Sequence, residues 1–132
     1  MVRAAPDWVW SALRDFGNVH VKLAPCFVTG CELQEDGTVR IVTFGNGATV
    51  RERLVACDGA MRRLVYTVEG GSFRHHSASA QVLAEGEGLS RFVWITDLLP
   101  EAMAPAVERM MDAGAAAIQS HLGDGGQPDT PG

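Results

Sequence analysis

The spacing of hydrophobic residues divides the chain into a helical start, a long strand region and a helical end. Between Ala104 and Leu122, apolar and small residues recur every three or four positions, which predicts a long amphipathic helix. Its buried stripe comprises Val107, Met110, Met111, Gly114, Ile118, His121 and Leu122. Methionines are flexible and glycine is small, so this stripe suits either ordinary core packing or the wall of a pocket.

A shorter helix is predicted at the start of the chain. Pro6 suits a first helical turn, Asp7 complements the positive end of the helix dipole, and apolar residues recur at helical spacing as far as Phe16. We expect a helix from Pro6 to Phe16 and one short helical turn between Asn18 and Pro25. This corner lacks a basic recognition face, which argues against DNA binding.

The region between the helical ends shows no helical period and contains turn sequences such as Asp36-Gly37 and Asn46-Gly47. The predicted strands are 28–33, 38–44, 49–57, 63–68, 74–83 and 89–98. Consecutive strands joined by tight turns form an antiparallel meander, so the chain is expected to be an α+β domain. Only the last helix is long and apolar enough to cover one face of such a sheet, and we expect the strands to curve around it.

Alternation in the third predicted strand places an acidic residue on an apolar face. Val50, Glu52 and Leu54 share one face, and Arg51 and Arg53 share the other. Burying a lone carboxylate is costly, so Glu52 requires a partner, water or a changed protonation state. A structural ion pair and a functional role are both open at this point.

The next two strands supply further candidates for an interior surface. Tyr66 and Val68 are expected to face inward, together with either His76 or, if the strand contains a bulge, His75. We favour His76, which would share its face with Ala78 and Ala80. Small side chains fill little space, so this pattern predicts a cavity beneath the strand. A hydrogen-bonded structural histidine is the alternative.

In the last predicted strand, Val93, Ile95 and Asp97 share one face, which we expect to contact the cavity. Phe92 and Trp94 are then expected to face outward. Asp97 lies near the strand end, so the alternative is that it caps the turn before the following proline.

Composition narrows the class of protein. The chain has 132 residues, 46% hydrophobic and 20% charged, with a net charge of −5 and no run of Lys or Arg, which indicates one globular domain and disfavours a nucleic-acid partner. Cys26, Cys31 and Cys57 are odd in number and lack metal-ligand spacing, which favours reduced thiols in a cytoplasmic protein without a metal site. No apolar run approaches ~20 residues, so no membrane insertion is expected. Residues 1–122 should form the domain, and 123–132 a disordered tail.

Several segments carry a family resemblance: Val9–Phe16, with the sequence VWSALRDF, then RERL at 51–54, RLVY at 63–66 and SRFVW at 90–94. With the predicted order of elements, they resemble the SRPBCC or START-like superfamily, and within it the small bacterial polyketide cyclase/dehydrase-like branch. The resemblance implies a helix-grip fold, in which the curved sheet wraps the last helix around a deep apolar cavity. It also places Glu52, Tyr66 and His76 on the cavity wall.

The resemblance implies binding of a hydrophobic small molecule, polyketide-like or lipid. Cofactor-independent cyclisation, dehydration or aldol-type chemistry is the predicted activity, in which Glu52 or His76 removes a proton beside a ketone and Tyr66 stabilises the oxyanion. A non-catalytic carrier or sensor is the alternative. The residues expected to contact the ligand are Val50, Val68, Ala78, Val93, Ile95, Asp97, Val107, Met110, Met111 and Gly114.

One departure from the family concerns the start of the chain. Family members begin with a complete strand before the first helix, whereas only five residues precede Pro6. Open sheet edges at 28–33 and 89–98, together with outward Phe92 and Trp94, would favour a homodimer or an upstream strand.

Overall fold

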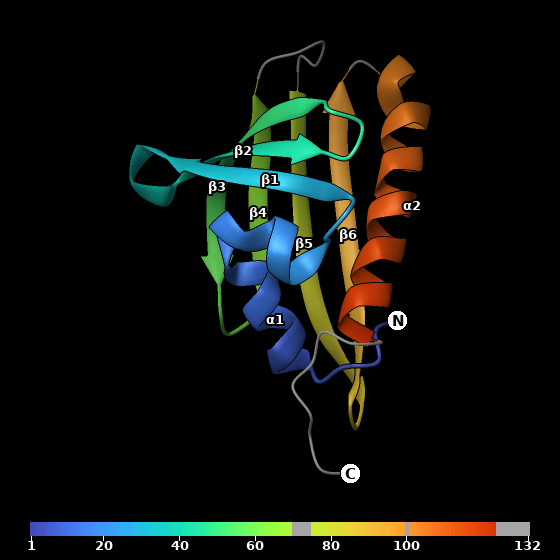
Figure 1. Cartoon of the computed structure of the whole chain (residues 1–132). Coiled ribbons are helices and arrows are strands. Elements are labelled where there is room, and N and C mark those ends of the chain that lie inside the picture. Colours follow the sequence, from blue (N-terminus) through green and yellow to red (C-terminus); the bar gives the residue numbers. More distant parts are fainter. Residues whose placement is uncertain (70–74, 100, 124–132) are drawn as a thin grey trace.

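A six-stranded antiparallel sheet curves against a long C-terminal helix (Figure 1). The computed structural model describes residues 1–69, 75–99 and 101–123, and only the backbone of His75. Residues 124–132 of the predicted tail (123–132) and the predicted strand start at Arg74 therefore lie outside the described residues.

The sheet follows the predicted meander, in which each strand pairs antiparallel with its neighbours in sequence. The strands are β1 (Val28–Gln34), β2 (Val39–Phe44), β3 (Thr49–Asp58), β4 (Arg63–Glu69), β5 (His75–Gly86) and β6 (Leu89–Leu99). Figure 1 shows β1 and β2 running crosswise to β4, β5 and β6, so the sheet is strongly curved. The space enclosed by this curve contains the core.

The helical segments lie at the two ends of the chain and in short turns. They are α1 (Pro6–Arg14), η1 (Phe16–Asn18), η2 (Val19–Leu23), η3 (Glu35–Gly37), η4 (Glu101–Met103) and α2 (Ala104–His121). Among the described residues, no helix is long and apolar enough to cross a membrane.

Helix α1 is shorter than the predicted range. It ends at Arg14 because Asp15 leaves the helical conformation, with a ψ of 80°, and Phe16 begins a separate turn. The Asp15 carboxylate accepts hydrogen bonds from Lys22 Nζ at 2.6 Å and Asn18 Nδ2 at 3.1 Å. These bonds, above all that from Lys22, lower the pKa of Asp15 and hold the corner that precedes β1.

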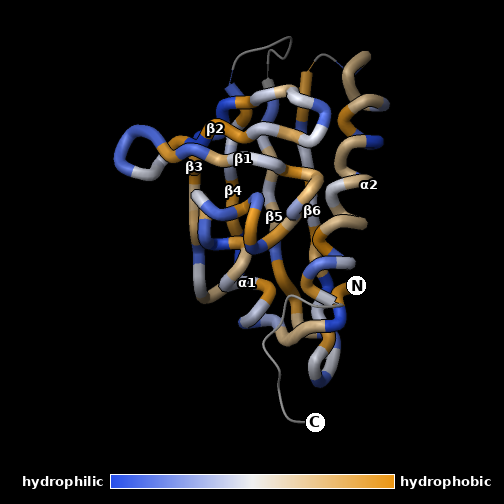
Figure 2. Tube along the Cα trace, in the orientation of Figure 1, coloured by the Kyte–Doolittle hydropathy of each residue, from blue (hydrophilic) through white to orange (hydrophobic). Residues whose placement is uncertain are grey.

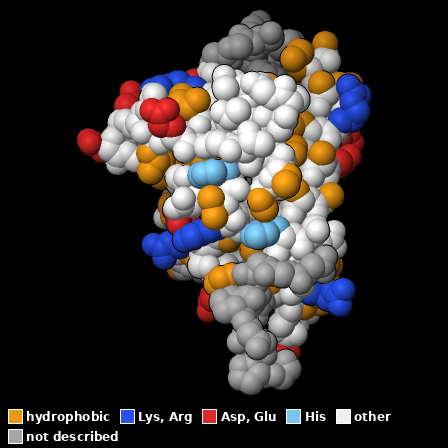
Figure 3. All heavy atoms as spheres, in the orientation of Figure 1, with side chains coloured by type: hydrophobic (Ala, Val, Ile, Leu, Met, Phe, Trp, Pro, Cys, Tyr) orange, Lys and Arg blue, Asp and Glu red, His pale blue; other side chains and the backbone are white. Residues whose placement is uncertain are grey.

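The turn between β1 and β2 projects away from the rest of the chain, and Figure 2 shows that this tip is hydrophilic. Beside it, Arg51 and Arg53 point to the outer face of the sheet, as predicted, and form ion pairs with Glu35 and Glu69. In the view of Figure 3, hydrophobic side chains form small separate groups and charged side chains lie mostly at the margins.

The start of the chain occupies part of the β6 edge. Val2 and Ser90 exchange two backbone hydrogen bonds of 2.8 and 2.9 Å, and Ser90 Oγ donates to the Ala4 carbonyl oxygen at 2.6 Å. Val2 and Ser90 are both buried. This isolated bridge stands where the resemblance leads one to expect a longer strand.

The face predicted for β6 is wrong. Phe92 pairs with Val82, and Trp94 pairs with Ala80. Directly paired residues share a face, so Phe92 and Trp94 point inward with Val82 and Ala80. The alanines of β5 leave room for these large rings.

The residues that alternate with Phe92 and Trp94 along β6 therefore face outward. Ile95 is 56% exposed, and Val93 and Asp97 share its face. Asp97 does not cap a turn either, because β6 continues to Leu99. Because Phe92 and Trp94 point inward, they do not supply the apolar outer surface that was expected to favour a dimer.

Candidate functional site

A cavity of about 250 Å³ lies between the curved sheet and α2. The sequence-predicted residues that line it are Val50, Glu52, Tyr66, Val68, His76, Val107, Met110, Met111 and Gly114. Ala78 is buried in the core but does not line the cavity, and Val93, Ile95 and Asp97 point away from it. The prediction that these four residues contact a cavity ligand therefore has no support in the geometry.

One end of the cavity is closed and the other is partly open. Lining residues that are half-buried or exposed occur at the end of β2, at the start of β3, in η4 and in the first turns of α2, namely Phe44, Val50, Met103, Ala106 and Met110. The lining residues from the helical start of the chain, Leu13, Val19 and Leu23, are buried. The mouth therefore lies beside the β2–β3 turn and the first turns of α2.

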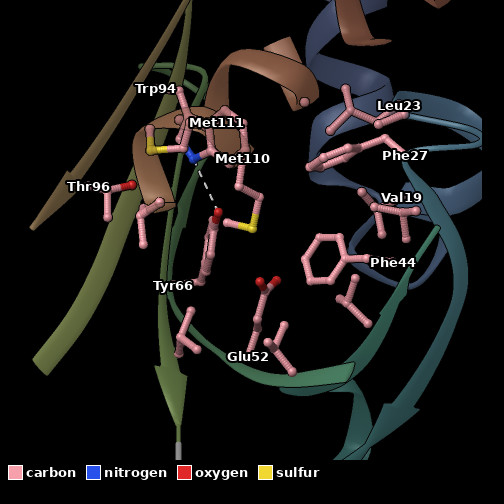
Figure 4. A pocket seen from close by; sticks show the side chains of 18 of the residues that line it. Val19, Leu23, Phe27, Phe44, Glu52, Tyr66, Trp94, Thr96, Met110 and Met111 are labelled. Atoms are coloured by element: carbon pink, nitrogen blue, oxygen red, sulfur yellow. Dashed lines mark hydrogen bonds between the residues drawn. The ribbon is translucent and has the colours of Figure 1, made fainter. Parts of the chain in front are cut away.

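Glu52 is buried and points into the cavity between the rings of Tyr66 and Phe44 (Figure 4). The partner of this side chain is Arg40, which lies directly opposite Glu52 on β2. Arg40 Nε donates to Glu52 Oε1 at 2.8 Å, and both residues are only 6% exposed. The carboxylate on the apolar face is thus one half of a buried ion pair.

The guanidinium of Arg40 is held by aromatic rings as well as by the carboxylate. Its Cζ lies 4.0 Å from the centroid of the Phe16 ring and 5.3 Å from that of Tyr66, and Nη1 donates to the Phe16 carbonyl oxygen at 3.1 Å. Cys31 Sγ contacts the same carbonyl at 3.6 Å, and burial raises the pKa of this thiol. Arg40 therefore ties Glu52 to the corner after α1.

Arg40 was not among the candidates from sequence, although part of a signal for it exists. Arg40 is the only charged residue in the predicted strand 38–44, where it shares a face with Val42 and Phe44, so it could have been considered as a partner for a buried Glu52. The exact pairing needed the structure, because the hairpin loop comprises residues 45–47 and places Arg40 opposite Glu52, whereas a two-residue Asn46-Gly47 turn would have placed it opposite Arg53.

Tyr66 is buried, and its hydroxyl meets the indole of Trp94. Trp94 Nε1 donates to Tyr66 Oη at 3.2 Å, as the dashed line in Figure 4 marks. Burial, and secondly the negative charge of Glu52, raise the pKa of Tyr66. The hydroxyl therefore keeps its proton at neutral and mildly alkaline pH.

His76, which the alternation favoured, faces the cavity. It is buried, lines the cavity and shares its face with Ala78 and Ala80. The side chain of His75 lies outside the described structure. Within residues 1–69, 75–99 and 101–123, no three His, Cys, Asp or Glu side chains are grouped so as to hold a metal ion.

Helix α2 approaches the sheet closely at Gly114. A Cβ atom at this position would lie 2.9 Å from Phe27 Cε2 and 3.0 Å from Trp94 Cζ3. The glycine thus makes space for two aromatic rings that line the cavity. These rings were missed from sequence because neither the face of β6 nor the course of the loop at Phe27 follows from periodicity.

The sequence of the chain matches a known protein family over nearly its whole length. The profile of a family described as polyketide cyclase / dehydrase and lipid transport matches residues 1–123. The chain belongs to this family. Membership confirms the SRPBCC-type resemblance and supports binding of a hydrophobic ligand. Among curated proteins, none matches the chain in sequence.

Solved structures similar to this family member share its fold. The protein XoxI from Bacillus cereus is 21% identical, with a TM-score of 0.81 over 93% of this chain and 91% of its own. A norcoclaurine synthase from Thalictrum, solved with a transition state analogue, is 20% identical, with a TM-score of 0.63 over 92% of this chain and 88% of its own. The protein Ara h 8.0201 is 20% identical, with a TM-score of 0.70 over 92% of this chain and 91% of its own. These similarities confirm the helix-grip fold.

Proposed function

We propose that the chain binds one small hydrophobic molecule in the cavity between the sheet and α2, with the polar end of the ligand at Tyr66 and Glu52. The observation that carries the proposal is a cavity with apolar walls in which these two polar groups point inward from neighbouring strands. Ligand sites typically combine an apolar wall with a few placed polar groups.

The size of the cavity favours a small ligand. Its volume of about 250 Å³ lies just below the range of roughly 300–1,000 Å³ that is common for ligand sites. A one- or two-ring molecule matches this volume better than a diacyl lipid or a four-ring polyketide does. Half-buried methionines beside the mouth, Met103 and Met110, add adaptability at the entrance.

Thermal unfolding with and without probe molecules tests this proposal. Indane and 1-indanone, each with two fused rings, should raise the Tm progressively as their concentration increases above the Kd, because a ligand bound only to the folded state stabilises it by about 2.7 kcal/mol at one hundred times its Kd. Glucose serves as the polar control and should leave the Tm unchanged. Equal effects of glucose and indane, or none from either bicyclic probe, would contradict an apolar binding site.

A catalytic role is the second candidate, and the arrangement of Glu52 and Tyr66 favours it. Glu52 Oε1 accepts from Arg40, whereas Oε2 accepts no hydrogen bond from the described residues, and Tyr66 directs its hydroxyl into the same cavity. In this role, Glu52 takes a proton from the carbon beside a ketone. The electron pair of the broken C–H bond passes to the ketone oxygen, where the Tyr66 hydroxyl stabilises the enolate.

Deuterium exchange measures this step without knowledge of the natural substrate. In D2O, the protein should accelerate exchange of the hydrogens beside the carbonyl of 1-indanone, as followed by proton NMR. Glu52→Gln should reduce the exchange by at least about 100-fold, the usual contribution of a positioned base, while the folded fraction still binds the probe. Unaccelerated exchange together with firm binding would favour the carrier or sensor role instead.

A further inference from the structure

The hydrogen bond between Trp94 and Tyr66 determines how the tyrosine hydroxyl can be used. An indole N–H only donates, so the Tyr66 oxygen accepts in this pair and its own proton is directed elsewhere. No oxygen atom of the described residues accepts that proton. Because Tyr66 lines the cavity, its hydroxyl presents a hydrogen-bond donor to a bound molecule.

The charged residues around this donor further restrict the chemical class of ligand that the cavity can bind. Glu52 and Arg40 are both buried and together carry no net charge. A ligand carboxylate at this end would add a negative charge that this neutral pair does not compensate, which is costly in an apolar cavity. A carbonyl oxygen accepts the tyrosine proton without this cost.

The position of Trp94 in the fold explains how the indole reaches across the sheet. Trp94 on β6 and Tyr66 on β4 are separated by β5, whose inward residues at this level are Ala78 and Ala80. Their small side chains leave the path between indole and hydroxyl open. Gly114 on α2 removes the remaining obstacle above the indole.

Building on the proposed ligand-binding function, we infer that the site selects neutral carbonyl compounds, such as cyclic or aromatic ketones, and that Trp94 determines this selectivity by fixing Tyr66 as a donor. Free fatty acids and other carboxylates are not its ligand class. Trp94 is a positioning residue in this account, because it acts through Tyr66.

Calorimetric titration of matched probes tests this inference. Indane and 1-indanone differ only in the carbonyl group. The desolvation of this carbonyl is the same for every variant, so the change in the ratio of the two Kd values between wild type and variant reports the hydrogen bond. Tyr66→Phe should lower the preference for 1-indanone by about three- to tenfold, the value of a neutral hydrogen bond, and leave indane binding unchanged. Trp94→Phe keeps an aromatic ring but removes the N–H, and it should lower the same preference by a smaller factor.

The possible outcomes separate the inference from the function on which it rests. A structural role for Trp94 would weaken both probes equally, and an unchanged ratio in both variants would overturn the inference while ligand binding stands. Tighter binding of indane-1-carboxylate than of 1-indanone to the wild-type protein would also overturn it, and would implicate His76 as a charged partner. Failure of both neutral probes to bind would refute the proposed function itself. The wild-type comparison remains decisive if either variant does not fold.

Discussion

Replacing Arg40 by methionine should lower the free energy of unfolding by about 3–5 kcal/mol, because it leaves the Glu52 carboxylate buried without its partner. The pair is almost inaccessible to water, with both side chains under one-tenth exposed, and Arg40 also donates to the Phe16 carbonyl. Denaturant unfolding followed by circular dichroism measures the loss.

Two further variants make this result specific. The double substitution Arg40→Met with Glu52→Leu removes both charges, and it should recover most of the lost stability or exceed the wild type. Arg51→Met removes an arginine of the partly exposed outer ion pairs and should cost only about 0–1 kcal/mol. A loss below about 1 kcal/mol in Arg40→Met would contradict this prediction, because it would mean that water solvates Glu52 in place of Arg40.

Closing the mouth of the cavity should have the largest effect on ligand binding. Ala106 is exposed, lies on α2 and lines the cavity, so a tryptophan in its place would lie across the entrance. Each ~60 Å² of apolar contact that the ligand loses weakens the Kd about tenfold. We therefore expect Ala106→Trp to weaken indane binding by about tenfold or more in calorimetric titration.

Ala113 provides the matched control for this variant. It is an exposed alanine on the same helix, but it does not line the cavity. Ala113→Trp should bind indane as the wild type does. Equal affinities of the two tryptophan variants would mean that the probe enters elsewhere or binds outside the cavity.

The sequence predicted much of the fold because strand alternation and helical spacing are local signals. Six strands, their order and the stripe on α2 all follow from such signals, as does the inward position of Glu52, Tyr66 and His76. The end of α1 was placed too late because its boundary depends on Asp15, whose hydrogen bonds reach beyond the helix.

The face of β6 could not be predicted from its own residues. Phe92 and Trp94 alternate with Val93 and Ile95, and either set is apolar enough to be buried. The residues packed against β6 decide which set is buried. Small residues of β5 and Gly114 of α2 leave a space that aromatic rings fill and that short aliphatic chains would leave partly empty.

The polar contacts of the site depend on pairs of distant residues. Arg40 meets Glu52 through the register of one hairpin, and Trp94 meets Tyr66 across an intervening strand. The first contact depends on the three-residue loop 45–47, which sets the register of the hairpin, and the second depends on side-chain packing in three dimensions. Two residues that line the cavity, Arg40 and Trp94, were therefore not assigned to it by alternation alone.

The most direct test of the account is a crystal structure of the protein with 1-indanone. We predict that the probe lies in the cavity beneath α2, with its carbonyl oxygen about 2.5–3.0 Å from Tyr66 Oη and its rings toward Met110 and Phe44. A probe bound on the outer face of the sheet, or one whose carbonyl points to the mouth and away from Tyr66, would contradict it.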